Sequence, residues 1–283
     1  MIQITKSDNA VVGVVTAILL TALVVAVLSL VQTVYVPEIM EQREAEHMEV
    51  VADQFASLKT VIDSQVSAKQ VDLPIATSVT LGSKELPYLM SVRAYGTLEI
   101  VADACRVNIT NSSDTESFPL GIIKYYSSNS YYLDQSYIYE TGAMIVSQSQ
   151  GNLMMIRPSF SVKLEQSIIN ITFNMVNISA LGQKSFAAGY GTYPIQTEYL
   201  SLTENKTIES VENINITSQY TNSWHIFLKG VLEKAGLVEN TNFMISEESD
   251  EWLRIDFLPP APQVNVNLSV VKIGAQVGPG WVE

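Results

Sequence analysis

The stretch AVVGVVTAILLTALVVAVLSLVQTVYVP, residues 10–37, decides the fold of this chain. It holds no charged residue in 28 positions, and 21 of those positions are apolar. A helix of this length spans about 40 Å at 1.5 Å per residue, more than the roughly 30 Å hydrocarbon core of a bilayer. A secretory signal sequence has an apolar region of only about 7–15 residues. The stretch therefore predicts a transmembrane helix over residues 11–36.

The charges on either side of this helix predict its orientation. Residues 1–9 carry the amino terminus and Lys6, whereas residues 38–50 hold five glutamates and only one arginine. Positively charged flanks stay on the cytoplasmic side of a membrane. We therefore expect a single-pass protein of the cell membrane, with residues 1–10 in the cytoplasm and residues 38–283 outside the cell.

An amphipathic helix is expected directly after the membrane span. Apolar residues spaced by three and four positions form a seam, while charged residues, Glu44 and Lys59 among them, are expected mostly elsewhere. The seam residues are Ala45, Met48, Val51, Phe55, Leu58 and Ile62. The pattern predicts a juxtamembrane helix over residues 38–70, with a kink at Pro37. The seam packs either on the domain that follows or on neighbouring subunits.

Residues 72–283 show a period of two, which is typical of half-exposed β-strands. Two segments, 169–175 and 264–270, alternate apolar and polar residues most regularly. Weaker strand patterns cover residues 91–104, 121–126, 143–147, 153–156 and 253–258, with a hairpin turn at residues 150–152. Many short strands without intervening helices predict a mainly β, antiparallel sandwich-like domain outside the cell.

Two segments interrupt this β pattern. Asn222 is expected to cap one short amphipathic helix that includes Trp224 and Phe227 and ends at Gly236. The polar residues 201–215 are expected to be a loop or a linker between two lobes of the β domain.

The residues that carry chemistry are few. His47 and His225 have no Cys or His partner at zinc-ligand spacing, and the acidic residues 247–251 lack the pattern of a calcium loop. Cys105 is the one cysteine, expected as a small buried residue on a strand, with a reactive thiol as the alternative. The sequence therefore predicts no catalytic residue, no cofactor and no metal site. A net charge of −13 also argues against nucleic acid as a partner.

Two kinds of surface feature are expected on the β domain. Seven Asn-x-Ser/Thr triplets are candidates for N-glycosylation, beginning at Asn108, Asn111, Asn170, Asn177, Asn205, Asn215 and Asn267. Six tyrosines between residues 125 and 139 either pack along strands or form an exposed contact patch.

The N-terminal region resembles the archaeal type IV pilin-like proteins. The resemblance rests on Asp8-Asn9-Ala10-Val11-Val12-Gly13-Val14-Val15, which opens a long apolar helix that continues into an amphipathic helix and a β-rich head. Residues 46–51, 126–129 and 139–143 look similar to uncharacterised euryarchaeal members with large ectodomains. The resemblance implies that residues 1–10 are leader-like, with a cleavage site at Ala10 and Val11. It also implies a prepilin peptidase, other pilin-like subunits and a pilus assembly machinery as partners.

The helix itself is compatible with packing against copies of itself. It lacks intramembrane charge, and small residues such as Gly13, Ala17, Ala22 and Ala26 permit close approach of two helices in lipid. Three classes of function therefore stay open. The first is a pilin-like structural subunit of a surface filament or secretion-type assembly, the second is a solitary membrane-anchored surface or adhesion protein, and the third is an exported enzyme or sensor.

Overall fold

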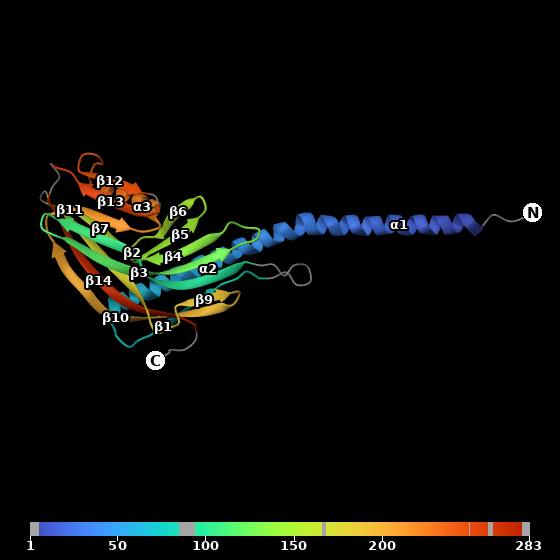
Figure 1. Cartoon of the computed structure of the whole chain (residues 1–283), viewed down its shortest axis with the longest axis horizontal. Helices are drawn as coiled ribbons and strands as arrows, with labels where there is room; N and C mark the ends of the chain where they lie inside the picture. Colours follow the sequence, from blue (N-terminus) through green and yellow to red (C-terminus); the bar gives the residue numbers. More distant parts are fainter. Residues whose placement is uncertain (1–5, 85–93, 166–167, 249, 260–262, 279–283) are drawn as a thin grey trace, which may run out of the picture.

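The structure consists of a long helical rod and a β-rich head (Figure 1). The computed structural model describes residues 6–84, 94–165, 168–248, 250–259 and 263–278, with side chains from residue 11 onward. The rod comprises α1 (Lys6–Leu30), a π-helical turn (Val31–Tyr35) and α2 (Val36–Ala68). α1 projects away from the head, whereas α2 runs across it. The predicted fold class, a long N-terminal helix followed by a mainly β domain with one short helix, is confirmed.

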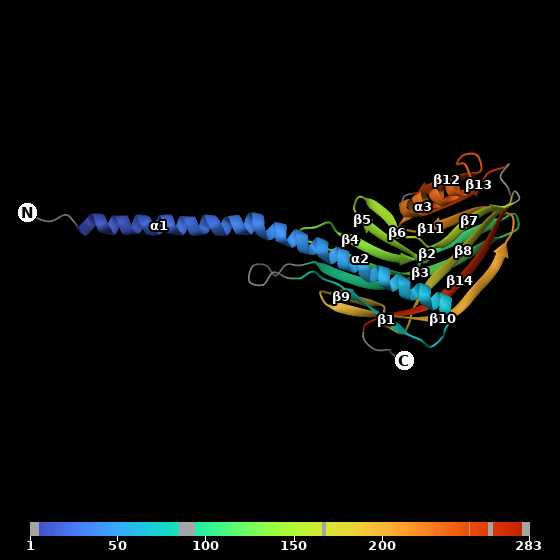
Figure 2. The same cartoon turned by 180° about the vertical axis from the view of Figure 1, so that it is seen from behind.

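The π-helical turn explains how the rod continues through Pro37. A proline within a helix lacks an N–H donor and crowds the carbonyl four residues earlier. Here Pro37 lies in the first turn of α2, and the N–H of Val36 donates to the carbonyl of Val31, five residues back. π turns of this kind are a common cause of helix bends. The rod changes direction at this level in Figure 2, so the bend lies in the turn that precedes the proline.

Two β-sheets form the head. The smaller has the strand order β1-β10-β14-β8-β7 and the larger has the order β12-β13-β11-β2-β3-β4-β5-β6, with β9 paired to β2. The strands of the five-stranded sheet are β1 (Ile75–Thr80), β7 (Ser159–Glu165), β8 (Ile168–Ala180), β10 (Thr192–Ile208) and β14 (Gln263–Val277). The strands of the nine-stranded sheet are β2 (Tyr95–Asn111), β3 (Thr115–Ser128), β4 (Gln135–Glu140), β5 (Ala143–Gln148), β6 (Gly151–Ile156), β9 (Phe186–Gly189), β11 (Val211–Thr217), β12 (Phe243–Glu248) and β13 (Trp252–Phe257).

One pairing differs from the predicted antiparallel arrangement. β8 and β14 run parallel over thirteen residue pairs, from Gln263 opposite Ile168 to Ala275 opposite Ala180. The two strands lie far apart in the chain, and a parallel pair needs a long crossover connection rather than a hairpin. The remaining pairings among the described strands are antiparallel.

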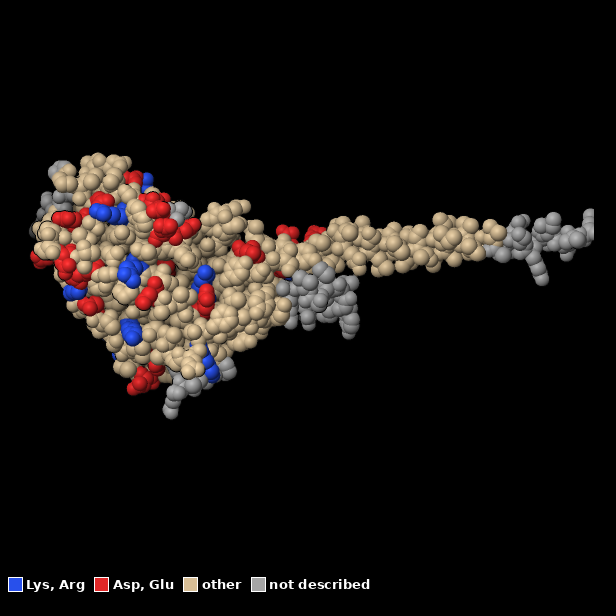
Figure 3. Space-filling model, viewed as in Figure 1, with Lys and Arg blue, Asp and Glu red and all other residues tan. Residues whose placement is uncertain are grey.

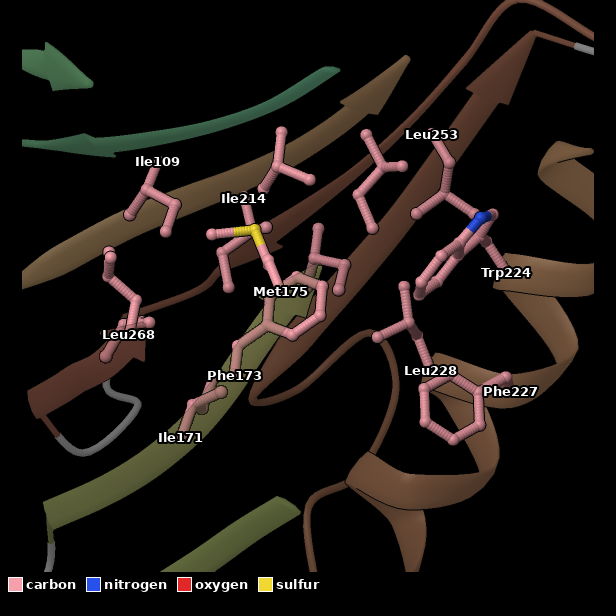
Figure 4. Close-up of a cluster of buried hydrophobic side chains, with 14 of the residues drawn as sticks. Ile109, Ile171, Phe173, Met175, Ile214, Trp224, Phe227, Leu228, Leu253 and Leu268 are labelled. Carbon is pink, nitrogen blue, oxygen red and sulfur yellow. The ribbon is translucent and has the colours of Figure 1, made fainter. Parts of the chain in front are cut away.

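A first hydrophobic cluster fills the space between the two sheets. Ile109 and Ile214 of the larger sheet face Phe173 and Leu268 of the smaller sheet (Figure 4). The alternating residues predicted to be buried in β8 and β14 contribute to this cluster, which confirms both strand predictions. The short helix α3 (Thr221–Lys234) closes one end of the cluster through Trp224 and two further apolar side chains.

A second hydrophobic cluster lies beneath α2. The seam residues Met48, Val51, Phe55, Leu58 and Ile62 are all buried and pack on side chains of both sheets. The alternative in which the seam packs on the following domain is therefore the one that the structure supports.

The two faces of β14 contribute to different hydrophobic clusters in the two halves of the strand. Residues 264, 266, 268 and 270 point into the first cluster, whereas residues 271, 273, 275 and 277, on the opposite face, belong to the second. α2 therefore covers this face of the smaller sheet only along the C-terminal part of β14, at residues 271–277. Figure 2 shows β10 and β14 continuing past the C-terminal end of α2.

Two local predictions are wrong. Residues 201–215 are not a loop: they form the end of β10, which pairs with β14 as far as Ile208, and the start of β11 in the other sheet. Two register shifts in β10 let its polar, Thr-rich sequence follow β14. Asn222 does not cap α3 either, because the helix begins at Thr221 and the Asn222 amide donates to the carbonyl of Asn152. The helix ends as predicted, with Gly236 at a φ of 89°.

A buried carboxyl group joins α3 to the larger sheet. Glu140, at the end of β4, accepts hydrogen bonds from the indole N–H of Trp224 (2.7 Å) and the hydroxyl of Ser218 (2.8 Å). Cys105 lies beside it and is buried on β2, as the sequence predicted. Burial raises the pKa of Glu140 to about 7, although the hydrogen bonds from Trp224 and Ser218 oppose this change.

This raised pKa predicts a pH dependence of folding. Because the folded state holds the proton of Glu140 more tightly than the unfolded state, the stabilisation is complete below pH 4.5 and is lost as the pH rises through about 7. We expect Glu140→Gln to raise the free energy of unfolding by about 3 kcal/mol relative to wild type at pH 8 and to leave it nearly unchanged at pH 4.5. Urea unfolding at both pH values measures this difference. An equal effect at the two pH values would contradict the assignment.

Candidate functional site

From residue 11 to residue 30, α1 carries no charge on any side. These residues are all exposed, with Val12, Ile18 and Leu20 at 62%, 62% and 64%. Figure 3 shows this part of the helix without acidic or basic residues, in contrast to the head and to the start of α2. A helix that is apolar all round is found in a protein core or in a membrane. The helical stretch Val11–Ala68 is long and apolar enough to cross a membrane, so the chain has a candidate membrane anchor.

The predicted packing and cleavage residues lie on this bare helix. Gly13 and Ala17 are one turn apart, and the described structure places nothing within 4 Å of the position that a Cβ on Gly13 would take. Ala10 and Val11 lie in the first turns of α1, which begins at Lys6. This side of the helix is therefore open to lipid or to another helix.

A buried carboxylate ties α2 to the loop between β3 and β4. Glu44 is fully buried, and its two oxygens accept hydrogen bonds from the backbone N–H groups of Ser130 (3.0 and 3.1 Å), Tyr131 (2.7 Å) and Tyr132 (2.8 Å). Successive backbone N–H groups that converge in this way form an anion-binding nest. Here the anion is a side chain of the rod itself.

The expected position of Glu44 and Lys59, away from the seam, is wrong. Both side chains are buried, and Lys59 pairs with Asp63 at 2.7 Å. Glu44 stands four residues after Met40 and four before Met48, both of which are buried. The helical period alone therefore places Glu44 on the face of α2 that packs against the head. A buried carboxylate is costly unless it accepts hydrogen bonds, so its position indicates that the head supplies donors.

His47 makes a second polar contact between α2 and the head. Its Nε2 lies 3.1 Å from the hydroxyl of Tyr125 and 3.3 Å from the carbonyl of Leu81, and the Tyr125 hydroxyl donates to the same carbonyl at 2.9 Å. Burial lowers the pKa of His47, while the Leu81 carbonyl and the charge of Glu44 act in the opposite direction. The group positions the helix and has no metal partner at hand among the described residues.

The tyrosine cluster serves mainly this junction. Tyr125, Tyr137 and Tyr139 are buried, and the Tyr137 hydroxyl donates to the backbone carbonyl of Met48 at 3.0 Å. Burial raises the pKa of Tyr137 to about 12. Strand packing accounts for these three residues, whereas Tyr126 is 38% exposed.

The seven Asn-x-Ser/Thr triplets differ in accessibility. The asparagines of two triplets, Asn205 and Asn267, are exposed on neighbouring strands β10 and β14. The other five are half-buried, and the Asn177 side chain accepts a hydrogen bond from the N–H of Gly121. Asn205 and Asn267 are therefore the most accessible acceptors for a glycan.

The two histidines and the acidic segment lie apart from any metal-binding group among the described residues. Within them, no group of three or more His, Cys, Asp or Glu side chains is placed to hold a metal ion. His225 pairs with Glu247 at 3.1 Å on the surface of the head. Glu248, in the acidic segment, accepts a hydrogen bond from the indole N–H of Trp252. These contacts are those of an ordinary polar surface.

Comparison with protein-family models, with curated proteins and with solved structures finds no match for this chain.

The nest around Glu44 predicts a specific loss of stability. Glu44→Gln replaces one acceptor oxygen by a donor that faces the N–H groups of residues 130–132, so at least one of these groups loses its partner. We expect the free energy of unfolding to fall by about 3 kcal/mol, because hydrogen bonds to a charged group are worth about 1.5–3 kcal/mol each. Chemical unfolding of the full chain in detergent micelles measures this loss.

Glu41→Gln is the matched control, since Glu41 lies on the same helix and is exposed. We expect this control to unfold like wild type and to resist protease in the loop 129–134. If the Glu44 and Glu41 variants behave alike, the carboxylate does not hold the loop.

Proposed function

We propose that this chain is a structural subunit, minor pilin-like or pseudopilin-like, of an archaeal surface filament or secretion-type assembly. α1 serves as the element of polymerisation and membrane anchoring, and the β-rich head makes contacts at the cell surface. The observation that carries this proposal is the difference in burial between the two helices of the rod. α2 is buried in the head by its seam and by Glu44, while α1 leaves the head with its whole apolar surface exposed.

The physics of apolar helices supports polymerisation. In lipid, helices associate through close packing rather than through the hydrophobic effect, and small residues bring the two backbones together. Gly13 and Ala17 provide such a stripe near the start of α1. Because α2 is fixed in the head, the packing of α1 against identical helices would also set the spacing of the heads.

The proposal includes an orientation and a set of partners. Lys6 before the span and the glutamates after it favour an N-terminus in the cytoplasm and a head outside the cell. Leader removal at Ala10 and Val11 by a prepilin peptidase, delivery to a pilus assembly machinery, and N-glycans on the head belong to the same proposal. Nucleic acid has no place in it, given the net charge of −13.

A solitary membrane-anchored surface or adhesion protein is the second candidate. It is favoured by the fact that lipid alone satisfies every exposed side chain of residues 11–30, which contain no intramembrane charge. The two candidates differ in whether α1 meets another α1.

Enlarging the small residues separates these candidates. We expect Gly13→Leu and Ala17→Leu to reduce crosslinked multimers of the native protein at least tenfold, in membranes and in sheared surface material. The reason is that a bulky residue holds the two backbones apart and removes many short-range contacts. Membrane insertion should be unchanged, because leucine is as favourable in lipid as alanine.

Val15→Leu is the matched control, because position 15 is already occupied by a bulky residue and lies on the opposite side of α1 from positions 13 and 17 by helical period. This control should assemble like wild type. Wild-type protein that yields no homo- or hetero-multimer at all would favour the solitary anchor.

A further inference from the structure

Beyond the end of α2, the outer face of the five-stranded sheet carries rows of amide and hydroxyl side chains. The backbone register aligns one row across four strands: Ser159, Asn174, Ser269 and Asn205. The next row in the same register is Ser161, Thr172, Asn267 and Thr207. All eight side chains are exposed or half-buried, whereas the alternate residues of β8 and β14 fill the core. We call these two rows the amide–hydroxyl face.

Hydrogen bonds between neighbouring strands order these rows. The Ser269 hydroxyl donates to Asn174 Oδ1 at 2.7 Å, and Asn174 Nδ2 donates to the Ser159 hydroxyl at 2.9 Å. In the second row, the Thr207 hydroxyl donates to Asn267 Oδ1 at 2.6 Å. The side chains are thus held in place before any ligand arrives, which lowers the entropy that binding must overcome.

The first row forms part of a groove with a volume of about 610 Å³. The C-terminal part of α2 forms one wall of the groove and includes Lys59 and Asp63. Lys69, Arg157 and the apolar side chain of Val271 also line the groove. A groove of this size suits a ligand of a few sugar rings rather than a single ion.

The charge of the groove is opposite to that of the chain. Among its described lining residues there are three cationic side chains and one carboxylate, whereas the whole chain has a net charge of −13. Lys59 neutralises Asp63 through the 2.7 Å pair. Within the described residues, Lys69 and Arg157 then remain as the excess positive charge at this groove.

We propose that the amide–hydroxyl face and its groove bind an acidic oligosaccharide when Asn205 and Asn267 carry no N-glycan, and this proposal does not depend on polymerisation of α1. Amide and hydroxyl groups both donate and accept, as the hydroxyl groups of a sugar require. Strands about 4.8 Å apart present these groups at regular intervals along a flat surface. Arg157 and Lys69 supply the charge-assisted hydrogen bonds that carboxylate or sulfate groups on the sugar would accept.

A glycan fits this groove better than a nucleic acid does. Sequence-independent binding of single-stranded nucleic acid combines a cationic groove with aromatic platforms on which bases stack. The described lining residues include no aromatic side chain on which bases could stack.

The test is a glycan array probed with the full chain in detergent micelles. The chain is made in a host that attaches no N-glycans, because Asn205 and Asn267 belong to glycosylation triplets. The array carries uronic acid, sialic acid and sulfated oligosaccharides beside their neutral counterparts, together with a single-stranded oligonucleotide. We expect binding to at least one acidic glycan, with affinity at least tenfold above that for its neutral counterpart.

Two variants assign this binding to the groove. Lys69→Gln with Arg157→Gln should lower the affinity at least tenfold, and Asn174→Ala with Ser269→Ala should lower it severalfold at unchanged charge. Lys229→Gln with Arg254→Gln is the control for lost charge, since both residues form surface ion pairs on α3 and β13, away from the groove. This control should bind like wild type.

Three outcomes would overturn the proposal. One is an absence of binding to every acidic glycan on the array. Another is binding that survives the Lys69 and Arg157 substitutions, or that falls equally in the control. The third is preferential binding of the oligonucleotide, or a dimer in light scattering that the Lys69 and Arg157 substitutions abolish, because a dimer formed through α1 would survive them.

Discussion

The packing of the α2 seam into the head is the interaction on which the rest of the structure depends. Val51, Phe55, Leu58 and Ile62 lie between side chains of both sheets, so the second hydrophobic cluster exists only while the helix is in place. Burial of each large apolar side chain contributes about 1.5–3 kcal/mol. The polar contacts of Glu44 and His47 determine how the helix is oriented and placed along its axis, because each contact joins one position of the helix to one position of the head. α2 is therefore part of the core of the head.

This constraint determines what the remaining surfaces can do. Because α2 packs into the head, α1 leaves the head at a defined position. The exposed apolar surface of α1 is unfavourable in water, so we expect lipid or other helices to cover it. At its other end α2 stops partway along β10 and β14. The sheet face that it leaves uncovered is polar, whereas the part that it covers is apolar. The rod thus has a candidate membrane anchor at one end, and an uncovered polar sheet face lies beyond its other end.

The sequence predicted the fold well where a hydrophobic period was long. The seam after Pro37 and the alternation in β8 and β14 follow from burial on one face, and the uncharged span is apolar on every side. A single sequence records both kinds of pattern directly. Other features depend on partners distant in the chain. In the sequence Glu44 resembles a surface glutamate, and only the fold brings residues 130–132 to it. The parallel pairing of β8 with β14 has no local sequence signal. Residues 201–215 resemble a loop because strands at a polar face lack apolar alternation.

Cysteine accessibility along the rod tests the central claim that one helix passes from lipid into the head. Single cysteines replace Ile18, Val50 or Val51 in a chain carrying Cys105→Ala, and permeabilised native membranes are treated with a water-soluble maleimide. Val50 is 48% exposed and Val51 is 0% exposed, although the two are neighbours on α2. The account predicts that Val50→Cys reacts at once, that Val51→Cys reacts only after denaturant is added, and that Ile18→Cys is protected until detergent dissolves the bilayer. Reaction of Ile18→Cys at the rate of Val50→Cys, or of Val51→Cys without denaturant, would contradict it.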